Sequence, residues 1–598
     1  MDSQSTRLAA LYQRTVSRRT MVKLVGGAAG LPVISSLIAA CGGSSSTKTS
    51  GTTASGQTQA TVIGGAPTPL NTFQNAGTPT TAPAATTAAT SATPTSSSSA
   101  SGTPKTGGTI NMSQINDPDT LDPVTAASIG ASIIFQYIYD SLVFIGEDHL
   151  PHPWIAEKWE ISTDGLQVTF SIRSGVKFHD GTDLDGAAVK ASFDRFLDPK
   201  LASIRKTGLG PITGIDLVDP QTVRFNYSTA FAPLFTSLDG DGIVSPTAVT
   251  KFGNSYGHNP VGSGPFMFKE WQTGQKVTLV KNPNFKQLRD DYKNKGPAYV
   301  DQLVWKNISD PATNNAALLS GELDIANVDL TQAASVQKNA EFKVYIWKDR
   351  DGFIFLDLNI NKPPFNDIAV RKATAYACDR DSIVQSAYNG FATANLLPIP
   401  TGVAGWDKSL EQYAYPFDLT KAKKTLTDAG YTAGSDGTMQ KDGKPLTFTM
   451  LIYSGNDPLK LSAQIIQASL QQIGIKCDTK VLDFSAELPQ LNSGDFQCDI
   501  MRWTSPDSNI LSLMFKSPGW DKQMNDPALD ALCTTADTTI DPTKRLDAVH
   551  AVVKYLLDKA YIAPIVTDWS LWAVHQYVKD YSLTVFGNGR LADVWLDK

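Results

Sequence analysis

The sequence predicts a mixed α/β fold that follows a polar, low-complexity leader. Alternating apolar residues around short turns predict three β-hairpins, at 159–172, 215–227 and 266–279. A strand at 446–452, a helix at 458–473 and a strand at 475–482 form a β–α–β unit, which favours a parallel sheet. A hydrophobic fraction of 41% and a charged fraction of 18% are those of a globular protein. The predicted body is therefore antiparallel-rich early and rich in β–α–β units later.

Length and charge narrow the class of protein. A chain of 598 residues is too long for one hydrophobic core and long enough for about three or four domains. The net charge is −6, and the first 106 residues carry seven basic side chains against one acidic one, so the body is acidic. An acidic body argues against a nucleic-acid partner, because phosphate binding needs a basic face. The composition also excludes a polytopic membrane protein.

The first 41 residues are predicted to be an export signal. A basic stretch with Arg18 and Arg19 precedes 24–40, which carries no charge but is short and weakly apolar for a membrane span. The paired arginines resemble a twin-arginine signal. The segment ending at Cys41 resembles a bacterial lipobox, which implies that Cys41 is acylated and becomes the first residue of the mature protein. The alternative is an uncleaved anchor helix with an incidental cysteine.

Residues 42–106 are predicted to be a disordered tether. Of these 65 residues, 54 are Ser, Thr, Ala, Gly or Pro, so the segment cannot bury enough apolar surface to offset its ordering entropy. As a flexible coil it would span roughly 45 Å. The sequence leaves open whether the tether is glycosylated.

The remaining predicted elements come from helical spacing and turn residues. Apolar residues at helical spacing predict a helix at 187–197, and another at 419–429 ends before Gly430. Asp310 opens a helix that stops at Gly321, and a short strand follows.

Several sequence blocks over 107–598 occur in an order that resembles one family. They include Ile172-Arg173-Ser174-Gly175-Val176-Lys177-Phe178-His179-Asp180-Gly181, Asn259-Pro260-Val261-Gly262-Ser263-Gly264-Pro265-Phe266, Asn282-Pro283-Asn284-Phe285 and Ala317-Leu318-Leu319-Ser320-Gly321-Glu322-Leu323-Asp324. The order resembles that of the extracytoplasmic solute-binding proteins of family 5, the dipeptide-, oligopeptide- and nickel-binding subunits of ABC importers.

The resemblance implies a type II periplasmic-binding-protein fold with two lobes and an inserted domain. It implies crossovers between the lobes near 353–359 and 568–575, which together form a hinge. The implied domains are a discontinuous lobe I at 107–142, 258–355 and 573–598, an inserted domain II at 143–257, and a lobe III at 356–572.

The resemblance also implies a function. The chain would be a lipoprotein on the outer face of the cytoplasmic membrane, would capture a peptide or similar polar solute, and would deliver it to an ABC permease and its ATPase. It would be a monomer with no cofactor, no metal and no catalysis of its own. A lipid-tethered hydrolase and a ligand-presenting sensor lipoprotein are the alternatives.

Candidate ligand-binding residues follow the predicted strand at 496–501. Ligands of α/β sheets bind beyond the carboxyl ends of strands, where the loop after that strand would lie. Peptide-binding relatives place an aspartate three positions after the tryptophan, but Pro506 stands there in this sequence. Asp507 either contacts ligand or caps the next helix, and Phe353 and Phe355 line a cleft or face the core. The full candidate set is Trp503, Thr504, Ser505, Asp507, Phe353, Phe355 and Trp569.

Three other motifs have simpler interpretations. Gly253-Asn254-Ser255-Tyr256-Gly257 matches a nucleophile pattern, but it follows a short predicted helix rather than a strand. His149 and His152 lack further metal ligands. Cys477 and Cys498 are expected on neighbouring strands, where they could form a disulfide or remain free thiols. The sequence does not determine the pairing of Cys378, Cys477, Cys498 and Cys533.

Overall fold

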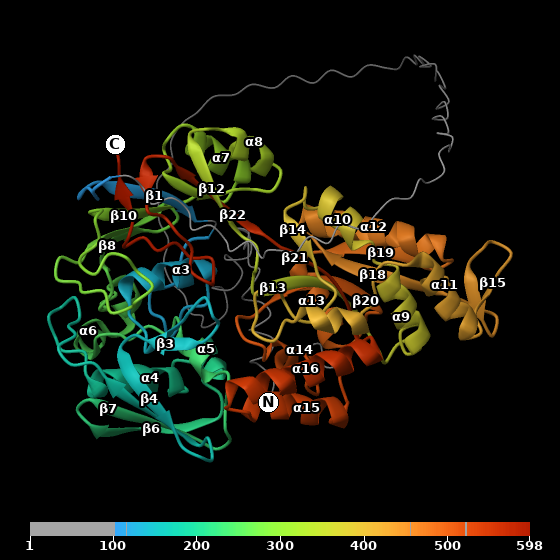
Figure 1. Cartoon of the computed structure of the whole chain (residues 1–598), viewed down its shortest axis with the longest axis horizontal. Helices are drawn as coiled ribbons and strands as arrows, with labels where there is room; N and C mark the ends of the chain where they lie inside the picture. Colours follow the sequence, from blue (N-terminus) through green and yellow to red (C-terminus); the bar gives the residue numbers. More distant parts are fainter. Residues whose placement is uncertain (1–101, 115, 455, 521–522) are drawn as a thin grey trace, which may run out of the picture. The chain divides into compact units, whose positions relative to one another are not determined.

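The computed structural model describes residues 102–114, 116–454, 456–520 and 523–598. The predicted export signal with Arg18, Arg19 and Cys41 lies outside the described residues, as does nearly all of the predicted tether. Three sheets of seven, six and four strands form the framework of the described part (Figure 1). In these residues no helix is both long enough and apolar enough to cross a bilayer.

The seven-stranded sheet collects strands from three separate parts of the sequence. Its order is β12-β22-β11-β1-β10-β9-β8, and β1 lies parallel to both of its neighbours. The strands are β1 (Thr109–Gln114), β8 (Phe266–Gln272), β9 (Lys276–Lys281), β10 (Gln302–Asn307), β11 (Ile325–Asn327), β12 (Phe342–Trp347) and β22 (Ser570–His575). The helices near it are α3 (Ile129–Ile138), α6 (Pro246–Phe252), α7 (Pro311–Leu319) and α8 (Ala333–Lys338), with the short pair β23 (Val578–Lys579) and β24 (Trp595–Leu596). The predicted hairpin of β8 and β9 is confirmed.

The four-stranded sheet is antiparallel throughout, in the order β4-β5-β7-β6. Its elements are β4 (Ala156–Ile161), β5 (Gln167–Ile172), β6 (Ile212–Asp219), β7 (Thr222–Tyr227), α4 (Gly186–Leu197), η1 (Ile204–Leu209) and α5 (Leu234–Leu238), with the pair β2 (Val143–Ile145) and β3 (Pro151–Pro153) nearby. Both predicted hairpins and the helix at 187–197 are confirmed. The inward side chains Phe170, Phe193 and Phe225 are fully buried and meet edge to face.

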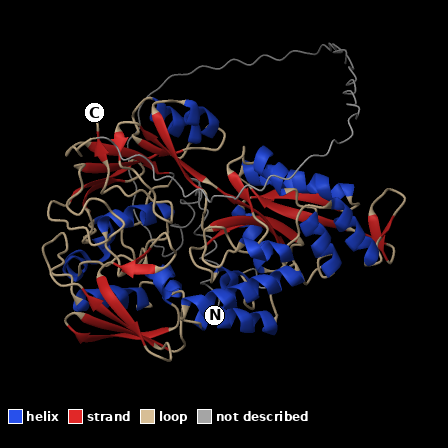
Figure 2. Ribbon diagram, in the orientation of Figure 1, coloured by secondary structure: helices blue, strands red, loops and turns tan. Residues whose placement is uncertain are grey.

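The six-stranded sheet has the order β14-β21-β13-β20-β18-β19 and carries helices on both faces (Figure 2). Its strands are β13 (Gly352–Leu358), β14 (Ala392–Ala394), β18 (Thr447–Tyr453), β19 (Lys476–Leu482), β20 (Cys498–Thr504) and β21 (Ile562–Asp568). One face packs on α9 (Ile368–Tyr376), α10 (Arg380–Ser386), α11 (Leu419–Asp428) and α12 (Asp457–Gln472). The other packs on α13 (Phe484–Asn492), α14 (Ile510–Phe515), α15 (Pro527–Thr538) and α16 (Pro542–Lys559).

The predicted β–α–β unit is confirmed, because β18 and β19 pair in parallel and α12 connects them. The smaller elements of this region are β15 (Thr432–Ala433), β16 (Met439–Lys441), β17 (Lys444–Pro445) and η3 (Lys408–Tyr413). Side chains alternate between the faces of β13, so Ile354 and Leu356 join one core and Phe353 and Phe355 join the other.

The chain passes twice between the two largest sheets. β12 ends at Trp347 in the seven-stranded sheet and β13 begins at Gly352 in the six-stranded sheet, so the first crossing is 348–351. The second crossing is Trp569, which joins β21 to β22. The first crossing lies a few residues before the predicted 353–359, because that apolar run is already the core of a strand and the polar residues before it form the link. The domain limits themselves stay a prediction.

The cysteine arrangement differs from the expectation. β18 lies between β19 and β20, so Cys477 and Cys498 are not on neighbouring strands. The four cysteines at 378, 477, 498 and 533 are free and buried. Burial raises the pKa of the Cys378 thiol to about 11, as expected for an unreactive core thiol.

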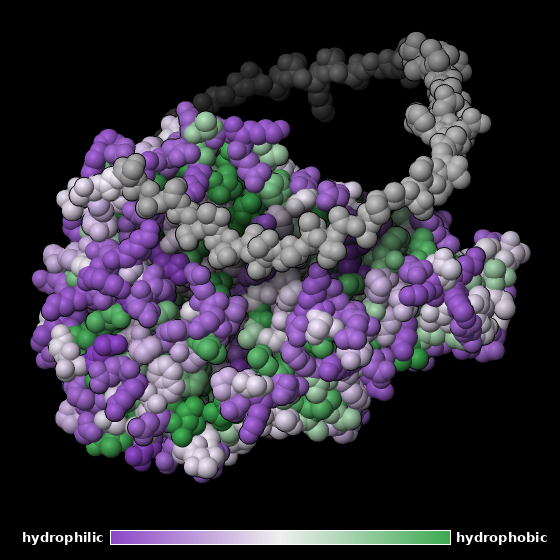
Figure 3. Space-filling model, in the orientation of Figure 1, coloured by the Kyte–Doolittle hydropathy of each residue, from purple (hydrophilic) through white to green (hydrophobic). Residues whose placement is uncertain are grey.

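The face of the described part drawn in Figure 3 is mostly hydrophilic, with hydrophobic side chains in small separate groups. The large exposed apolar residues lie on different elements, for example Leu217 and Val218 on β6 and Leu513 on α14. Scattered exposure of this kind is ordinary for a water-soluble surface.

Two carboxyl groups are buried together inside the six-stranded region. Asp499 of β20 is 0% exposed and Glu487 of α13 is 1% exposed. Burial raises the pKa of Asp499 well above its usual value, and the nearby Glu487 and Asp357 carboxyls raise it further. Burial also raises the pKa of Glu487. Two carboxyl groups this close titrate as a pair and retain a proton to higher pH than either would alone.

We expect the shared proton to make stability depend on pH near neutrality. The folded-state pKa is raised, so the contribution to stability is fully present below the unfolded pKa and is lost as the pH rises through the folded pKa. Asp499→Asn replaces the protonated acid by a neutral isostere. The variant should be more stable than the parent by about 1–3 kcal/mol at about pH 8, with a smaller difference at about pH 5. Urea unfolding followed by fluorescence across this range measures it, and a parallel pH dependence in both proteins would contradict the shared proton.

Candidate functional site

The structure places three of the candidate ligand residues together at the end of β20. Trp503 and Thr504 are the last two residues of the strand, and both are half-buried. The Trp503 ring meets the Trp520 ring edge to face, with 5.3 Å between centroids. Ser505 follows directly, and its backbone N–H donates to the Asp351 carbonyl at 2.8 Å. These residues therefore lie beside the first crossing. The strand runs three residues beyond the predicted end at 501, so Trp503 and Thr504 belong to the strand and only Ser505 lies in the loop after it.

The two phenylalanines of β13 are core residues. Phe353 and Phe355 are both 0% exposed, and their rings stack with 4.9 Å between centroids. They pack in the cluster that contains residues of α14, α15 and α16. The sequence allowed Phe353 and Phe355 either to line a cleft or to face the core, and the structure shows that they face the core.

Trp569 forms the second crossing. Its indole N–H donates to the Thr393 hydroxyl at 2.8 Å, and the Lys348 ammonium lies 4.5 Å from its ring centroid. The Trp569 ring also meets the Phe391 ring edge to face. The side chain is half-buried, and it connects the two crossings because Lys348 belongs to the first one.

Asp507 is fully engaged by other protein groups. Its carboxylate forms a bidentate ion pair with Arg545 of α16 and accepts from the Asn509 backbone N–H at 2.8 Å. The Thr236 hydroxyl of α5 donates to the same carboxylate at 3.0 Å. Burial alone would raise the pKa of Asp507, but Arg545 and these hydrogen bonds hold it below its usual value. The cap residue of α14 is Asn509, so Asp507 neither caps that helix nor has free lone pairs for a ligand amine.

The Asp507 contacts join the region of the four-stranded sheet to that of the six-stranded sheet. The Ala232 backbone N–H donates to the Asp537 carbonyl at 2.8 Å beside the Thr236–Asp507 hydrogen bond. The two contacts come from the segment that contains α5 on one side and from the segments around α14 and α15 on the other. We call this pair of contacts the α5 contact.

A cluster of half-buried ions lies at the two crossings, and sequence reasoning missed it. Arg350 of the first crossing donates from Nη1 to Asp568 Oδ2 at 2.7 Å. Arg502 of β20 donates from Nε to Asp568 Oδ1 at 3.2 Å. Burial alone would raise the pKa of Asp568, but the Arg502 and Arg350 guanidinium groups hold it below its usual value. The only sequence signal was that Arg502 directly precedes Trp503.

Two hollows lie near the seven-stranded sheet, away from the crossings. The first, a cavity of about 80 Å³, is lined by α3, by Asp239 and Arg289, and by Thr584, Phe586 and Asn588. The second, an open hollow of about 440 Å³, is rimmed by Glu147, Asp148, Asp290, Asp291, His152 and Arg590.

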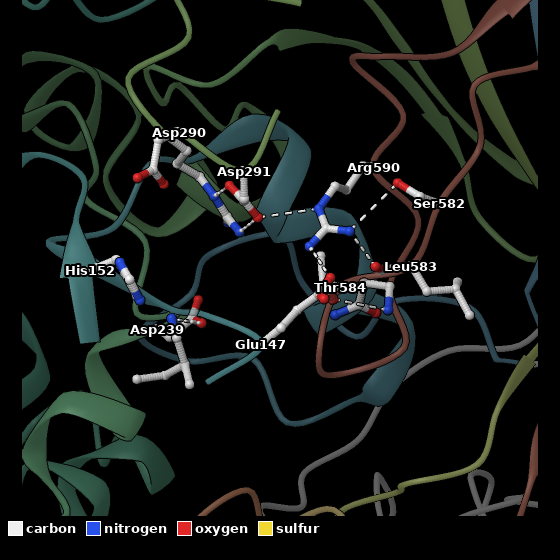
Figure 4. Close-up of polar contacts among 12 residues, drawn as sticks. Glu147, His152, Asp239, Asp290, Asp291, Ser582, Leu583, Thr584 and Arg590 are labelled. Atoms are coloured by element: carbon white, nitrogen blue, oxygen red, sulfur yellow. Dashed lines mark hydrogen bonds and ion pairs between the residues drawn. The ribbon is translucent and has the colours of Figure 1, made fainter. Parts of the chain in front are cut away.

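Two of the acidic residues at the second hollow, Asp291 and Glu147, pair with arginines. Asp291 faces Arg590, whose Nε donates to Oδ2 at 3.1 Å, and Arg289 donates to the same carboxylate at 2.8 Å (Figure 4). His152 contacts the Asp148 carboxylate and stacks on Phe144. Among the described residues no group of three or more His, Cys, Asp or Glu side chains could hold a metal ion.

Ser255 lacks the geometry of a nucleophile. It lies in η2 (Gly253–His258), a 3₁₀-helix that directly follows α6, and its side chain is exposed. A nucleophile elbow instead requires a sharp turn from a strand into a helix.

Comparison with known proteins gives a consistent family. The sequence model of one family, described as bacterial extracellular solute-binding proteins, family 5 Middle, matches residues 151–522 of this chain. The glutathione-binding protein GsiB of Salmonella paratyphi A is 30% identical over 367 residues, which cover 61% of this chain and 67% of the relative.

Solved structures extend the likeness to the whole body. NikA from Brucella suis in complex with Fe(III)-EDTA is 25% identical with a TM-score of 0.72, over 82% of this chain and 100% of NikA. The periplasmic binding protein DppA from Helicobacter pylori in complex with the peptide STSA is 26% identical with a TM-score of 0.65, over 83% of this chain and 99% of DppA. The predicted type II periplasmic-binding-protein fold is thereby confirmed. These relatives are solute-binding proteins and not enzymes, and the chain belongs to family 5 of the bacterial extracellular solute-binding proteins.

Proposed function

We propose that this chain is the lipid-tethered binding subunit of an ABC importer, which captures a peptide or a similar polar solute between two closing lobes. The observation that carries the proposal is the pair of crossings at 348–351 and Trp569. Both are short. The first lies beside the candidate ligand residues Trp503 and Thr504, and the second follows Asp568, which accepts a hydrogen bond from Arg502. A hinge made of two short segments needs few torsional changes to open or close a cleft.

Ligand binding drives closure only by its difference in affinity between the open and closed forms. Groups that come from both sides of the crossings supply such a difference, because only the closed form presents them together. Trp503 belongs to the six-stranded side, and Arg350 and Trp569 lie in the crossings themselves, so closure would bring groups of the seven-stranded side toward them. One relative is named a glutathione-binding protein, and the two related structures are complexes with the peptide STSA and with Fe(III)-EDTA. These ligands support a small polar solute as the ligand class.

The tether places this binding body at the membrane. Acylation of Cys41 would fix the chain to the outer face of the cytoplasmic membrane, and the 65 residues of 42–106 would let the body reach a permease. The loaded, closed monomer would dock on the permease, and ATP hydrolysis by a partner subunit would power import.

We expect the purified body to release a small solute on denaturation and to bind it again after dialysis. Mass spectrometry of the released material identifies the solute, and isothermal titration against peptides, sugars and metal chelates measures its affinity. A body that binds no small solute, even after refolding from denaturant, would contradict the proposed function.

We expect Cys41→Ser to release the protein from the membrane. The serine variant should lose incorporation of an alkyne-labelled fatty acid and should move from the membrane pellet to the soluble fraction, because no acyl chain remains to bind the bilayer. Cys477→Ala, which removes a buried cysteine instead, is the matched control and should stay anchored. Retention of Cys41→Ser in the pellet would show that the segment 24–40 itself acts as the anchor.

We expect Thr236→Val to shift the body toward the open form. The valine keeps the shape of threonine but removes the hydrogen bond to Asp507, a loss of about 0.5–1.5 kcal/mol and so roughly a two- to tenfold change in the closed-to-open ratio. Distances between spin labels on exposed positions of β6 and α15 report the ratio. Thr250→Val, whose hydroxyl bonds only within α6, is the control, and an unchanged distance distribution in Thr236→Val would show that the α5 contact does not hold the closed form.

A further inference from the structure

The cluster at the crossings has more hydrogen-bond donors than acceptors. Asp568 accepts one N–H from Arg350 and one from Arg502. Arg350 Nε and Arg502 Nη2 are buried atoms, and neither has a hydrogen-bond partner. Each guanidinium group carries five N–H donors and no acceptor. A buried, unpaired N–H keeps its desolvation penalty, and an acceptor that binds there would offset it. Unpaired buried groups in native proteins are rare and usually mark a missing ligand, ion or water.

The cluster also lies at the carboxyl ends of two parallel strands. Arg502 is on β20, two residues before the end of the strand, and β18 runs parallel beside it and ends at Tyr453. The carboxyl ends of adjacent parallel strands are the usual ligand position in α/β sheets. Gly352 packs closely against this region: a Cβ there would stand 2.5 Å from Thr504 Oγ1 and 3.2 Å from Arg502 Nη2, so a larger residue would crowd the guanidinium group.

The neighbouring groups decide the sign of the ligand charge. Arg350 and Arg502 come from different elements and share the single acceptor Asp568, while Asp351 is the other nearby acid. Burial lowers the pKa of Arg350, and the neighbouring Arg502 charge lowers it further, because the two cations repel each other. A ligand carboxylate between them would add to the effect of Asp568 and Asp351 in offsetting this repulsion, and it would accept the unpaired N–H groups. Planar guanidinium forks match a carboxylate in geometry better than any neutral acceptor.

We propose that Arg350 and Arg502 bind a carboxylate of the imported solute at the carboxyl end of β20. This assignment rests on the proposed function and makes it specific: the solute is an acid, and its carboxylate enters beside the hinge. Because Arg350 belongs to the first crossing and Asp568 adjoins the second, the bound carboxylate contacts the segments that move on closure. Recognition and closure would therefore use the same two side chains.

The test compares each solute with its neutral form. The probes are reduced glutathione against its diethyl ester, trialanine against its C-terminal amide, and the solute released from the purified protein against its methyl ester. Isothermal titration gives the ratio of the two dissociation constants for every pair that binds. A charge-assisted hydrogen bond predicts a preference for the acid of about 10- to 100-fold in the parent protein.

The variants then assign the preference to the arginine. Arg502→Gln should reduce the ratio to near one, while Arg224→Gln, on β7 of the four-stranded sheet, should leave it unchanged. Arg502→Lys keeps the charge but loses the fork and should give an intermediate ratio. The ratio within one protein is insensitive to a general loss of stability, and if Arg502→Gln does not fold, the parent and lysine proteins still decide.

Three results separate the proposals. A tight solute without an acidic group, or an ester that binds as well as its acid, overturns the carboxylate site and leaves the binding function intact. An unchanged ratio in Arg502→Gln also overturns the site, because Arg502 would then serve only as a structural partner of Asp568. A protein that binds no small solute at all overturns the proposed function, and the carboxylate site with it.

Discussion

Asp568 is the acceptor on which the arrangement at the hinge depends. It ends β21 one residue before the second crossing, and it binds Arg350 in the first crossing and Arg502 on β20. Burying two guanidinium groups without an anion would be costly, so the carboxylate is required for both to lie there. The ion cluster consequently ties the two crossings to the strand that carries Trp503.

The α5 contact gives Asp507 a structural role that differs from the one expected by analogy with peptide-binding relatives. A carboxylate that binds a ligand amine must keep lone pairs available, but Arg545, Asn509 and Thr236 occupy those of Asp507. Pro506 removes the aspartate from the usual position, and the neighbouring Asp507 turns toward α16 instead. The recognition chemistry must therefore differ from that of relatives that use this aspartate for an amine.

Local patterns were sufficient for most of the fold. The hairpins β4–β5, β6–β7 and β8–β9 followed from period-two alternation around turn residues, and the parallel pair β18–β19 followed from its intervening helix. The first crossing was placed a few residues late, because an apolar run is equally compatible with a link and with a strand. Strand order was not accessible either, and for this reason Cys477 and Cys498 were expected on adjacent strands that β18 in fact separates.

The candidate site was harder to predict because its interactions join residues that are distant in sequence. The Arg350–Asp568 hydrogen bond spans 218 positions, and the Thr236–Asp507 bond spans 271. Neither residue pair belongs to a motif, and a single sequence holds no record of which charged residues meet. The run 502–507 was identified because it follows a strand, a local signal. The partners that decide its chemistry are set only by tertiary packing.

The same packing explains why recognition in this protein should be electrostatic. Phe353 and Phe355 fill the core beneath the sheet, and the Trp503 ring is partly covered by Trp520, so the aromatic surface left for stacking on a solute is small. The groups at the crossings whose bonding is incomplete include two guanidinium N–H donors, Arg350 Nε and Arg502 Nη2. Such donors favour a ligand with an anionic acceptor and disfavour a solute that cannot supply one, because the donors then stay buried and unpaired. Selectivity for acids would thus follow from a deficit of acceptors rather than from the shape of an apolar pocket.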